Sequence, residues 1–483
     1  MAAKDFIVAI EIGSSKVTAI AGRKNIDGSI SVLAVVKEPS SSFIKRGVIY
    51  NIDKTVLCIK NLINKLQQQL KAKIKWVYVG VGGQSIHSVK NIIVKDLAPG
   101  TKITQNMVSE IMEENRGAQY SDMEIIDVAE QEYKIDNNFQ IDPVGIQCSR
   151  LEGHFLNILQ RKSFYDKLNK CIENAEVEIA DLFLAPLALA DSVLTESEKR
   201  SGCALADIGA DTTTVLVYSK NILRHLAVIP LGSNNITKDI ASLQIDEPDA
   251  EKLKIKHGSA YTDPADVDSK LLLSLGTDVQ VESEKFIEIV EGRTEEIIAN
   301  VWNQIPQDYA NKLIGGIILT GGGSKMTNIV KAFAAYTHIE KIRIAHFVTQ
   351  TISSSNNDIN SHNGMMNTIL ALLAKGDENC AGGEIDPDDI FSNGTTKTGE
   401  GRSGRTKEPR NISNLPGGVV PTASDKAKAE EEAQRKQKEA EEEARRKQEE
   451  EEERKKKEKK ENSLIRRIKE KISEIAGSLT EPE

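Results

Sequence analysis

The sequence predicts an α/β protein of two related lobes that hold a ligand between them. Two observations favour this fold: the same strand–turn–strand pattern occurs twice, about two hundred residues apart, and a further apolar strand ends in a run of glycines. Apolar, β-branched segments separated by a short polar turn are typical of hairpins. A duplicated hairpin therefore indicates two lobes of similar construction.

The two hairpins share an order: an apolar strand, an acid, isoleucine, glycine, small polar residues and a second strand. The copies read Phe6-Ile-Val-Ala-Ile-Glu11-Ile12-Gly13-Ser14-Ser15-Lys16-Val-Thr-Ala-Ile20 and Cys203-Ala-Leu-Ala-Asp207-Ile208-Gly209-Ala210-Asp211-Thr212-Thr213-Thr214-Val-Leu-Val217. A tight turn directs several donors at one point, which suits a phosphate. Glu11 and Asp207 cannot sit on a phosphate, but each can hold a hydrated Mg²⁺ that bridges carboxylate and phosphate.

The third element is the apolar strand 315–320, which runs into Gly321, Gly322, Gly323 and Ser324. Beyond it, apolar residues recur at helical spacing. Glycines let a ligand approach the backbone closely, and a helix N-terminus favours anions. One such turn or glycine run is more often ordinary turn chemistry. The three elements in this order predict a nucleotide-binding cleft.

These elements resemble the phosphate-1, phosphate-2 and adenosine motifs of the actin/Hsp70/sugar-kinase ATPases, and within them the FtsA branch of bacterial cell division proteins. The resemblance covers about residues 5 to 375 and resumes at the C-terminus, and segments 228–240 and 249–258 are specifically FtsA-like. It implies an actin-like (ribonuclease H-like) two-lobed ATPase fold with an inserted α+β subdomain. The implied cofactors are ATP and Mg²⁺.

The resemblance also implies a role for each motif residue. Glu11 and Asp207 are the expected catalytic residues and would order Mg²⁺ with its waters. The phosphates are expected at Gly13, Ser14, Ser15, Lys16, Gly209, Ala210, Asp211, Thr212 and Thr213, and the adenosine at Glu251, Lys254, Gly321, Gly322, Gly323 and Ser324. Because Glu251 and Lys254 are three residues apart, they share a helix face, where an ordinary surface ion pair is the alternative.

Two of the motifs depart from the family pattern. Glu11 stands where most actin-fold ATPases have aspartate, and Ala210 and Asp211 stand where the family usually has glycine. Ala210 disfavours a positive φ at that turn. Asp211 brings a negative charge near the phosphate, unless it turns outward or binds metal. We therefore expect ATP binding with at most weak ATPase activity, in a protein that acts chiefly as a structural adaptor.

Composition narrows the class of partner. A chain of 483 residues has room for about two to four domains. A formal net charge of -9 and 4% aromatic residues disfavour nucleic-acid binding. The five scattered cysteines lack metal-ligand spacing and are typical of free thiols in a reducing cytosol. The start of the chain has no signal-peptide pattern and no apolar run could span a bilayer, so any membrane contact is expected to be peripheral.

Periodicity and composition divide the chain into segments. We predict a first lobe at 1–83 and 165–201, with the inserted α+β subdomain at 84–164. The second lobe comprises 202–240 and 313–375, around a helical subdomain at 241–312. A disordered linker at 376–424, a charged helical or disordered tether at 425–461 and an amphipathic helix at 462–477 follow. By resemblance, the inserted subdomain serves filament formation and contact with later division proteins, and the helical subdomain binds FtsZ.

Individual elements follow from the same patterns. The expected helices are 53–70, 107–115, 182–194 and the closing segment 365–373. The expected strands include 76–81, 86–94, 133–135, 145–148 and 154–159. In the helical subdomain, an apolar stripe is interpreted as core rather than as a ligand pocket; it consists of Phe286, Ile289, Val290, Ile297, Ile298, Val301 and Trp302.

The tail changes composition sharply near residue 376. The linker is rich in glycine, serine, asparagine, threonine and proline, and cannot bury enough apolar surface to order itself. As a flexible coil it would span roughly 40 Å. The charged run at 425–461 has i, i+4 pairs that favour an isolated helix of ~54 Å, with a solvated coil as the alternative. Either state would act as a spacer.

The terminal segment has the pattern of a basic amphipathic helix, which is typical of peripheral membrane binders. The residues expected to bind the membrane are Leu464, Ile465, Arg466, Arg467, Ile468, Lys469, Lys471, Ile472 and Ile475. Each basic residue near anionic lipid adds about 1 kcal/mol. The helix lacks Trp and Phe, so we expect weak binding that strengthens when linked copies act together. Docking on protein is the alternative.

Together these patterns favour a protein that polymerises on the cytoplasmic face of the inner membrane, at the division septum, and tethers the FtsZ ring to it. Two alternatives share the fold. A small-molecule kinase needs a catalytic base beside an acceptor pocket, and the sequence indicates none. A pilus-assembly scaffold of the PilM type generally ends without the charged tether and amphipathic helix found here.

Overall fold

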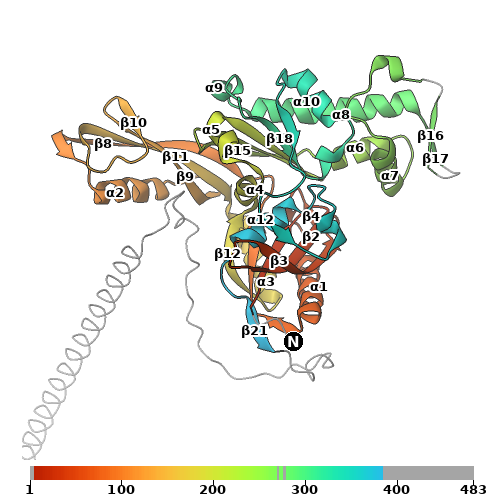
Figure 1. The fold of residues 1–483 in the computed structure, drawn as a ribbon, viewed down its shortest axis with the longest axis horizontal. Helices are drawn as coiled ribbons and strands as arrows, with labels where there is room; N and C mark the ends of the chain where they lie inside the picture. Colours follow the sequence, from red (N-terminus) through yellow and green to blue (C-terminus); the bar gives the residue numbers. More distant parts are fainter. Residues whose placement is uncertain (1–4, 269–270, 276–278, 385–483) are drawn as a thin grey trace, which may run out of the picture. The chain divides into compact units, whose positions relative to one another are not determined.

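The computed structural model describes residues 5–268, 271–275 and 279–384. They build two large sheets, of six and nine strands, with helices packed against each (Figure 1). The predicted tether at 425–461, the amphipathic helix at 462–477 and most of the linker at 376–424 lie outside the described residues.

The six-stranded sheet forms the first lobe. Its strands, in order across the sheet, are β12 (Glu178–Leu184), β7 (Trp76–Val81), β1 (Ile7–Ile12), β2 (Lys16–Lys24), β3 (Ile30–Pro39) and β20 (Ile352–Ser353). Strand β1 pairs antiparallel with β2 and parallel with β7. Every residue of β1 except Glu11 is buried, so both faces of the sheet are covered. The covering helices are α1 (Ile52–Leu70), α3 (Lys162–Asn174), α4 (Ala185–Val193) and α12 (Asn367–Lys375).

Helix α1 shows how local signals set these elements. The Asn51 side chain caps its start by accepting from the Lys54 backbone N–H at 3.0 Å. Its apolar stripe is buried, with Ile59 and Leu66 at 0% exposure. Lys71 ends the helix in a left-handed conformation. The predicted helix at 53–70 is therefore confirmed.

The nine-stranded sheet belongs to the second lobe and continues into the inserted subdomain. Its strands, in order, are β10 (Asn138–Gln140), β9 (Met123–Ile135), β11 (Gln147–Arg161), β8 (His87–Lys102), β15 (Ile222–Ile229), β14 (Thr213–Ser219), β13 (Cys203–Ile208), β18 (Gly316–Thr320) and β19 (Ile342–Ile344). Strand β13 pairs antiparallel with β14 and parallel with β18. The first lobe has the same arrangement in β1, β2 and β7, so the predicted repeat exists in three dimensions.

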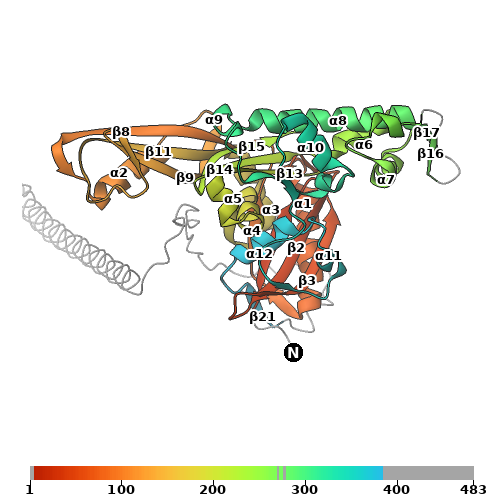
Figure 2. The same cartoon turned by 45° about the horizontal axis from the view of Figure 1, so that its top comes forward.

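Strands β8 to β11 and helix α2 (Gln105–Arg116) form the inserted subdomain, with a small core of its own. Figure 2 shows β8 and β11 extending away from β15. The ladder pairing between β8 and β15 is short, with His87 opposite Ala227, and is supplemented by the Leu226 N–H, which donates to Ser88 Oγ at 2.8 Å, and by an ion pair between Arg224 and Glu132 at 3.2 Å. The prediction of separate strands at 145–148 and 154–159 is wrong, because β11 pairs with β8 on one edge and β9 on the other and is continuous. The predicted strand at 133–135 is only the end of β9.

The helical subdomain contains α6 (Ser233–Ala241), α7 (Glu247–His257), α8 (Ser283–Gln304) and the hairpin β16 (Leu272–Leu275) with β17 (Val279–Glu282). The predicted stripe on α8 is core: Phe286, Val290 and Ile298 are at most 1% exposed. The helix α10 (Ile329–Thr337) packs against α8. The remaining short elements are β4 (Ile44–Lys45), β5 (Val48–Ile49), α5 (Glu196–Ser201), α9 (Gln307–Ala310), α11 (Asn357–Asn360), η1 (Pro264–Asp266) and η2 (Gly322–Lys325).

Two predicted boundaries are wrong. Residues 182–184 belong to strand β12, and the helix begins only at Ala185, because these residues extend the parallel ladder along β7. Residues 381–384, predicted as part of a disordered linker, form strand β21 (Ala381–Glu384), which pairs with β6 (Ala72–Ile74). The buried Tyr78 hydroxyl accepts from the Glu378 N–H at 2.9 Å and donates to Asp377 Oδ1 at 2.9 Å. These contacts hold a segment whose composition alone resembles a coil.

Candidate nucleotide site

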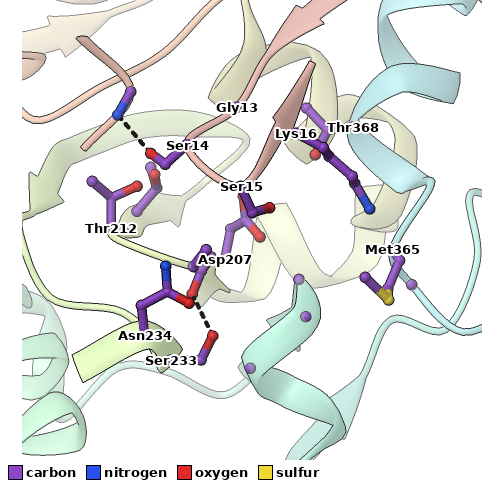
Figure 3. A pocket seen from close by; sticks show the side chains of 18 of the residues that line it. Gly13, Ser14, Ser15, Lys16, Asp207, Thr212, Ser233, Asn234, Met365 and Thr368 are labelled. Carbon is purple, nitrogen blue, oxygen red and sulfur yellow. Dashed lines mark hydrogen bonds between the residues drawn. The ribbon is translucent and has the colours of Figure 1, made fainter. Parts of the chain in front are cut away.

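A cavity of about 440 Å³ lies where the two hairpins and the glycine-ended strand β18 meet. Residues of both lobes line it, and Figure 3 shows Ser14, Lys16 and Asp207 around it. The predicted site residues found in its wall are Glu11, Gly13, Ser14, Ser15, Lys16, Asp207, Gly209, Ala210, Thr212, Glu251, Lys254, Gly321, Gly322 and Gly323. Asp211, Thr213 and Ser324 do not line it.

The first turn, between β1 and β2, is held from behind by the loop that follows β3. The Ser40 hydroxyl donates to the Gly13 carbonyl at 2.7 Å, and the Gly47 N–H donates to Ser14 Oγ at 2.8 Å. A Cβ atom at Gly13 would lie 2.6 Å from the Lys16 carbonyl oxygen. The turn therefore requires glycine at this position, and its hydroxyl and backbone groups face the cavity.

The second turn, between β13 and β14, is closed by the Gly209 N–H, which donates to the Thr212 carbonyl at 2.8 Å. The start of α6 packs on it, since the Ser233 N–H donates to the Gly209 carbonyl at 3.0 Å. Thr213 turns away, and its hydroxyl donates to the Leu231 carbonyl at 2.9 Å. The predicted phosphate contact by the Thr213 side chain is thus not supported by its orientation.

The structure shows how the two unusual residues of this turn, Ala210 and Asp211, are accommodated. Ala210 does not adopt a positive φ, so its Cβ creates no strain there. Asp211 turns out of the cavity, where its carboxylate accepts from the Asn234 side chain at 2.8 Å and from the Arg46 N–H at 3.2 Å. Of the options left open for Asp211, the structure has the outward one.

The glycine run after β18 approaches Asp207 closely. Gly321 has φ +84°, and a Cβ there would lie 2.4 Å from Asp207 Oδ1. A Cβ at Gly323 would lie 2.3 Å from a side-chain carbon of Ile208. Ser324 is buried and its hydroxyl donates to the Gly321 carbonyl at 2.8 Å, so it shapes the turn rather than the cavity wall.

Two carboxylates face this cavity from opposite lobes. Burial raises the pKa of Glu11 to about 7, although the nearby Lys16 partly opposes the shift. Burial also raises the pKa of Asp207 to about 6. Within the described residues, no group of three or more metal-ligating side chains forms a complete metal cage. Two partly buried carboxylates without a full ligand set suit Mg²⁺, which keeps several waters and takes further oxygens from a phosphate.

The pair on α7 lies at one side of the cavity. Lys254 Nζ donates to Glu251 Oε2 at 2.6 Å, to Thr237 Oγ1 at 2.7 Å and to the Ser233 carbonyl at 3.1 Å. The Lys254 side chain is only 7% exposed, whereas that of Glu251 is 40% exposed. Lys254 is therefore not part of an ordinary surface ion pair, and its bonds to α6 connect this side of the cavity with the second turn.

Several lining residues were missed in the sequence. Gly82 and Gly83 follow strand β7 in the same way that Gly321 and Gly322 follow β18. A strand that ends in two glycines is a signal in the sequence that could have revealed them. Ser233 and Asn234 lie in an FtsA-like segment but were not assigned to the site. Gly47, Met365 and Thr368 also line the cavity, without a local signal that could have revealed them.

Comparison with known proteins supports one family. A family model described as cell division protein FtsA matches residues 204–361, and one described as an SHS2 domain inserted in FtsA matches residues 83–159. The FtsA protein of Porphyromonas gingivalis is 32% identical over 67% of this chain and 69% of its own length. The FtsA protein of Neisseria meningitidis serogroup B is 33% identical over 68% of this chain and 80% of its own length.

Solved structures agree on the fold. A PilM-PilN type IV pilus biogenesis complex aligns with a TM-score of 0.54 at 14% identity, covering 76% of this chain and 97% of the matched one. At that identity the likeness shows the fold alone, which is the predicted actin-like, two-lobed architecture. With the two family models and relatives above 30% identity over most of their length, the chain belongs to the family of the cell division protein FtsA.

Proposed function

We propose that this chain binds ATP with Mg²⁺ between its lobes, assembles into filaments on the inner membrane and tethers FtsZ to that membrane at the division septum. The observation that carries the proposal is the cavity lined by two matched turns, one from each lobe. A ligand that contacts both turns favours the closed arrangement of the lobes, which gives ATP a means of controlling assembly.

The residues of the cavity fit a magnesium nucleotide. Glu11 and Asp207 would hold Mg²⁺ through its waters, and the ion would neutralise charge on the phosphates. The backbone groups of the two turns, the hydroxyls of Ser14, Ser15 and Thr212, and Lys16 would bind phosphate oxygens. Gly321 and its neighbours leave room for the adenosine, beside Glu251. Lys254 would support the site indirectly, because its three hydrogen bonds position Glu251 and helix α6.

Turnover is expected to be slow, in keeping with an adaptor rather than an enzyme. Glu11 and Asp207 are partly buried, and burial raises the pKa of each carboxyl group, so a bound cation is needed to favour their ionised form at neutral pH. The proposed partners occupy other surfaces: FtsZ the helical subdomain, and further subunits and later division proteins the inserted subdomain. Family membership and the positions of the two subdomains, which lie on opposite sides of the described residues in Figure 2, support these assignments.

The proposed membrane anchor is the amphipathic segment at 462–477, which lies outside the described residues. Among the helices that the structure describes, none is long and apolar enough to cross a bilayer. As a basic amphipathic helix, the anchor would insert its apolar face, formed by Leu464, Ile468 and Ile472 with their neighbours, into anionic lipid.

Co-sedimentation of purified FtsZ with anionic lipid vesicles tests the proposal. The full-length chain should recruit FtsZ, more strongly with ATP, whereas a version ending at Lys460 should not. A version ending at Gly477 is the matched control, because it removes only the residues after the helix and should recruit normally. Equal recruitment by the version ending at Lys460 would refute the anchor. No recruitment by any version would favour a nucleotide-dependent scaffold or a kinase.

A further inference from the structure

The short hairpin of β4 and β5 touches the phosphate turns of both lobes. At its tip, the Gly47 N–H donates to Ser14 Oγ at 2.8 Å in the first turn. The neighbouring Arg46 N–H donates to Asp211 Oδ2 at 3.2 Å in the second turn. Two consecutive backbone groups thus connect turns that lie about two hundred residues apart in the sequence. Opening the cavity by separating the lobes must break one of these contacts.

Asp211 is held in this orientation by its own lobe. Its second carboxylate oxygen accepts from the Asn234 side chain at 2.8 Å. Asn234 is itself fixed at the start of α6, where its N–H donates to the Ala210 carbonyl at 2.7 Å. The Asp211 carboxylate therefore joins the start of α6 to the opposite lobe. It points away from the cavity, although both of its neighbours in the sequence, Ala210 and Thr212, line the cavity.

The tip of the hairpin has little freedom to follow if the second lobe moves. Arg46 and Gly47 have φ values of +51° and +72°. A Cβ at Gly47 would lie 2.6 Å from Gly83 Cα, and the Gln84 N–H donates to the Arg46 carbonyl at 3.0 Å. The tip is thus packed against the glycine turn that ends β7. A rigid donor facing a rigid acceptor makes the Arg46–Asp211 contact sensitive to the distance between the lobes.

We propose that Asp211 is a positioning residue that latches the two lobes together over the phosphate turns and slows the release of bound nucleotide. The proposal rests on the nucleotide site described above. A carboxylate acceptor makes a stronger hydrogen bond than a neutral one, so this contact contributes more than an amide or water could in its place. Asp211 acts through the Arg46 loop and not by touching the ligand.

Release of a fluorescent ATP analogue (mant-ATP with Mg²⁺), chased with unlabelled ATP in a stopped-flow instrument, tests the latch in the full-length chain. D211A should release the analogue about tenfold faster, because hydrogen bonds to charged groups contribute more than neutral ones. D211N should be intermediate, since the single amide oxygen can serve only one of the two donors. N234A should also speed release, and combining it with D211A should add nothing, because both act on the same contact.

The matched control is D136A. Asp136 is another carboxylate whose oxygen accepts from backbone and hydroxyl donors, those of Ser149 and Arg150, but it lies in the inserted subdomain. Its removal should leave release unchanged. Thermal unfolding of each variant without nucleotide separates lost stability from lost latching, because a merely structural role would lower the melting temperature without changing the release rate.

Three results would overturn the latch. Release from D211A at the wild-type rate would show that the contact does not limit opening. Slower release would show that the carboxylate instead repels the phosphates. If D211A does not fold, a wild-type release rate in D211N has the same meaning. Failure of the wild-type chain to bind the analogue would refute the nucleotide site itself, and with it the latch, and is distinguishable from the other results in the first measurement.

Discussion

Replacing Gly321 by alanine tests whether the glycine run is shaped by its approach to Asp207. Gly321 has φ 84° and ψ 175°, a region of backbone conformation that is essentially restricted to glycine. Its Cβ would lie 2.4 Å from Asp207 Oδ1 and 2.6 Å from the Ile208 carbonyl oxygen. The added methyl group would therefore force either the backbone of the turn or a proposed magnesium ligand to move.

The size of the effect follows from two separate terms. Holding alanine in this backbone region costs about 1–3 kcal/mol. The overlap with Asp207 and Ile208 adds to this cost, and we expect the free energy of unfolding to fall by about 3 kcal/mol in total. Displacement of Asp207 should also weaken the binding of magnesium ATP by about tenfold, equivalent to ~1.4 kcal/mol.

Gly28 offers a matched control within the same chain. Its φ is +82°, close to that of Gly321, but nothing lies within 4 Å of its Cβ position. G28A should cost only about 1 kcal/mol and leave nucleotide binding unchanged. Urea unfolding measured by circular dichroism and titration calorimetry with magnesium ATP would compare the two variants. Equal destabilisation, with wild-type affinity in G321A, would show that the turn relaxes freely and that the approach to Asp207 imposes no constraint.

Two further substitutions probe the ion pairs. E198Q should lower the free energy of unfolding by about 2 kcal/mol at pH 7: burial alone would raise the pKa of Glu198, but hydrogen bonds from Arg343 and Thr195 lower it to about 2. Because this pKa is lowered from 4.5, the stabilisation by the Glu198 carboxylate is lost as the pH falls from about 4.5 toward 2. The urea unfolding midpoints of E198Q and the wild type should therefore converge in that pH range. A difference between the midpoints that does not change with pH would contradict the reasoning. K254M should weaken magnesium ATP binding about tenfold in calorimetry, because it removes the three hydrogen bonds of the buried Lys254 ammonium group to Glu251, Thr237 and Ser233. K252M, on the exposed face of the same helix, should not, and equal effects would assign both lysines to the surface.

Local patterns predicted the parts of the fold whose signals lie within one segment. The strands β1, β2, β13, β14 and β18 and the helix α1 follow directly from apolar periodicity and turn residues. Errors arose where a neighbour decides the outcome. Residues 182–184 are apolar enough for either a strand or a helix, and pairing with β7 makes them a strand. Residues 376–384 have the composition of a coil, but Tyr78 and β6 order them.

The site shows the same division. The turns around Gly13, Gly209 and Gly321 could be predicted, because glycine, an acid and flanking strands are adjacent in the sequence. The tip at Arg46 and Gly47 could not, because its position over the cavity depends on contacts with Ser14, Gly83 and Asp211, all distant in sequence. Neither the hairpin of β4 and β5 nor the loop after β3 has the sequence of a phosphate-binding motif.

Asp211 shows most clearly why adjacency in sequence is a poor guide to electrostatics. The sequence places the Asp211 carboxylate near the phosphate unless it turns outward or binds metal, and does not decide between these outcomes. Successive side chains in a tight turn point in different directions, and two donors, one from α6 and one from the opposite lobe, draw this one outward. The same substitution that looks unfavourable for binding a phosphate thus supplies the acceptor that joins the lobes. A departure from a family motif therefore has to be interpreted from its partners in space and not from its charge alone.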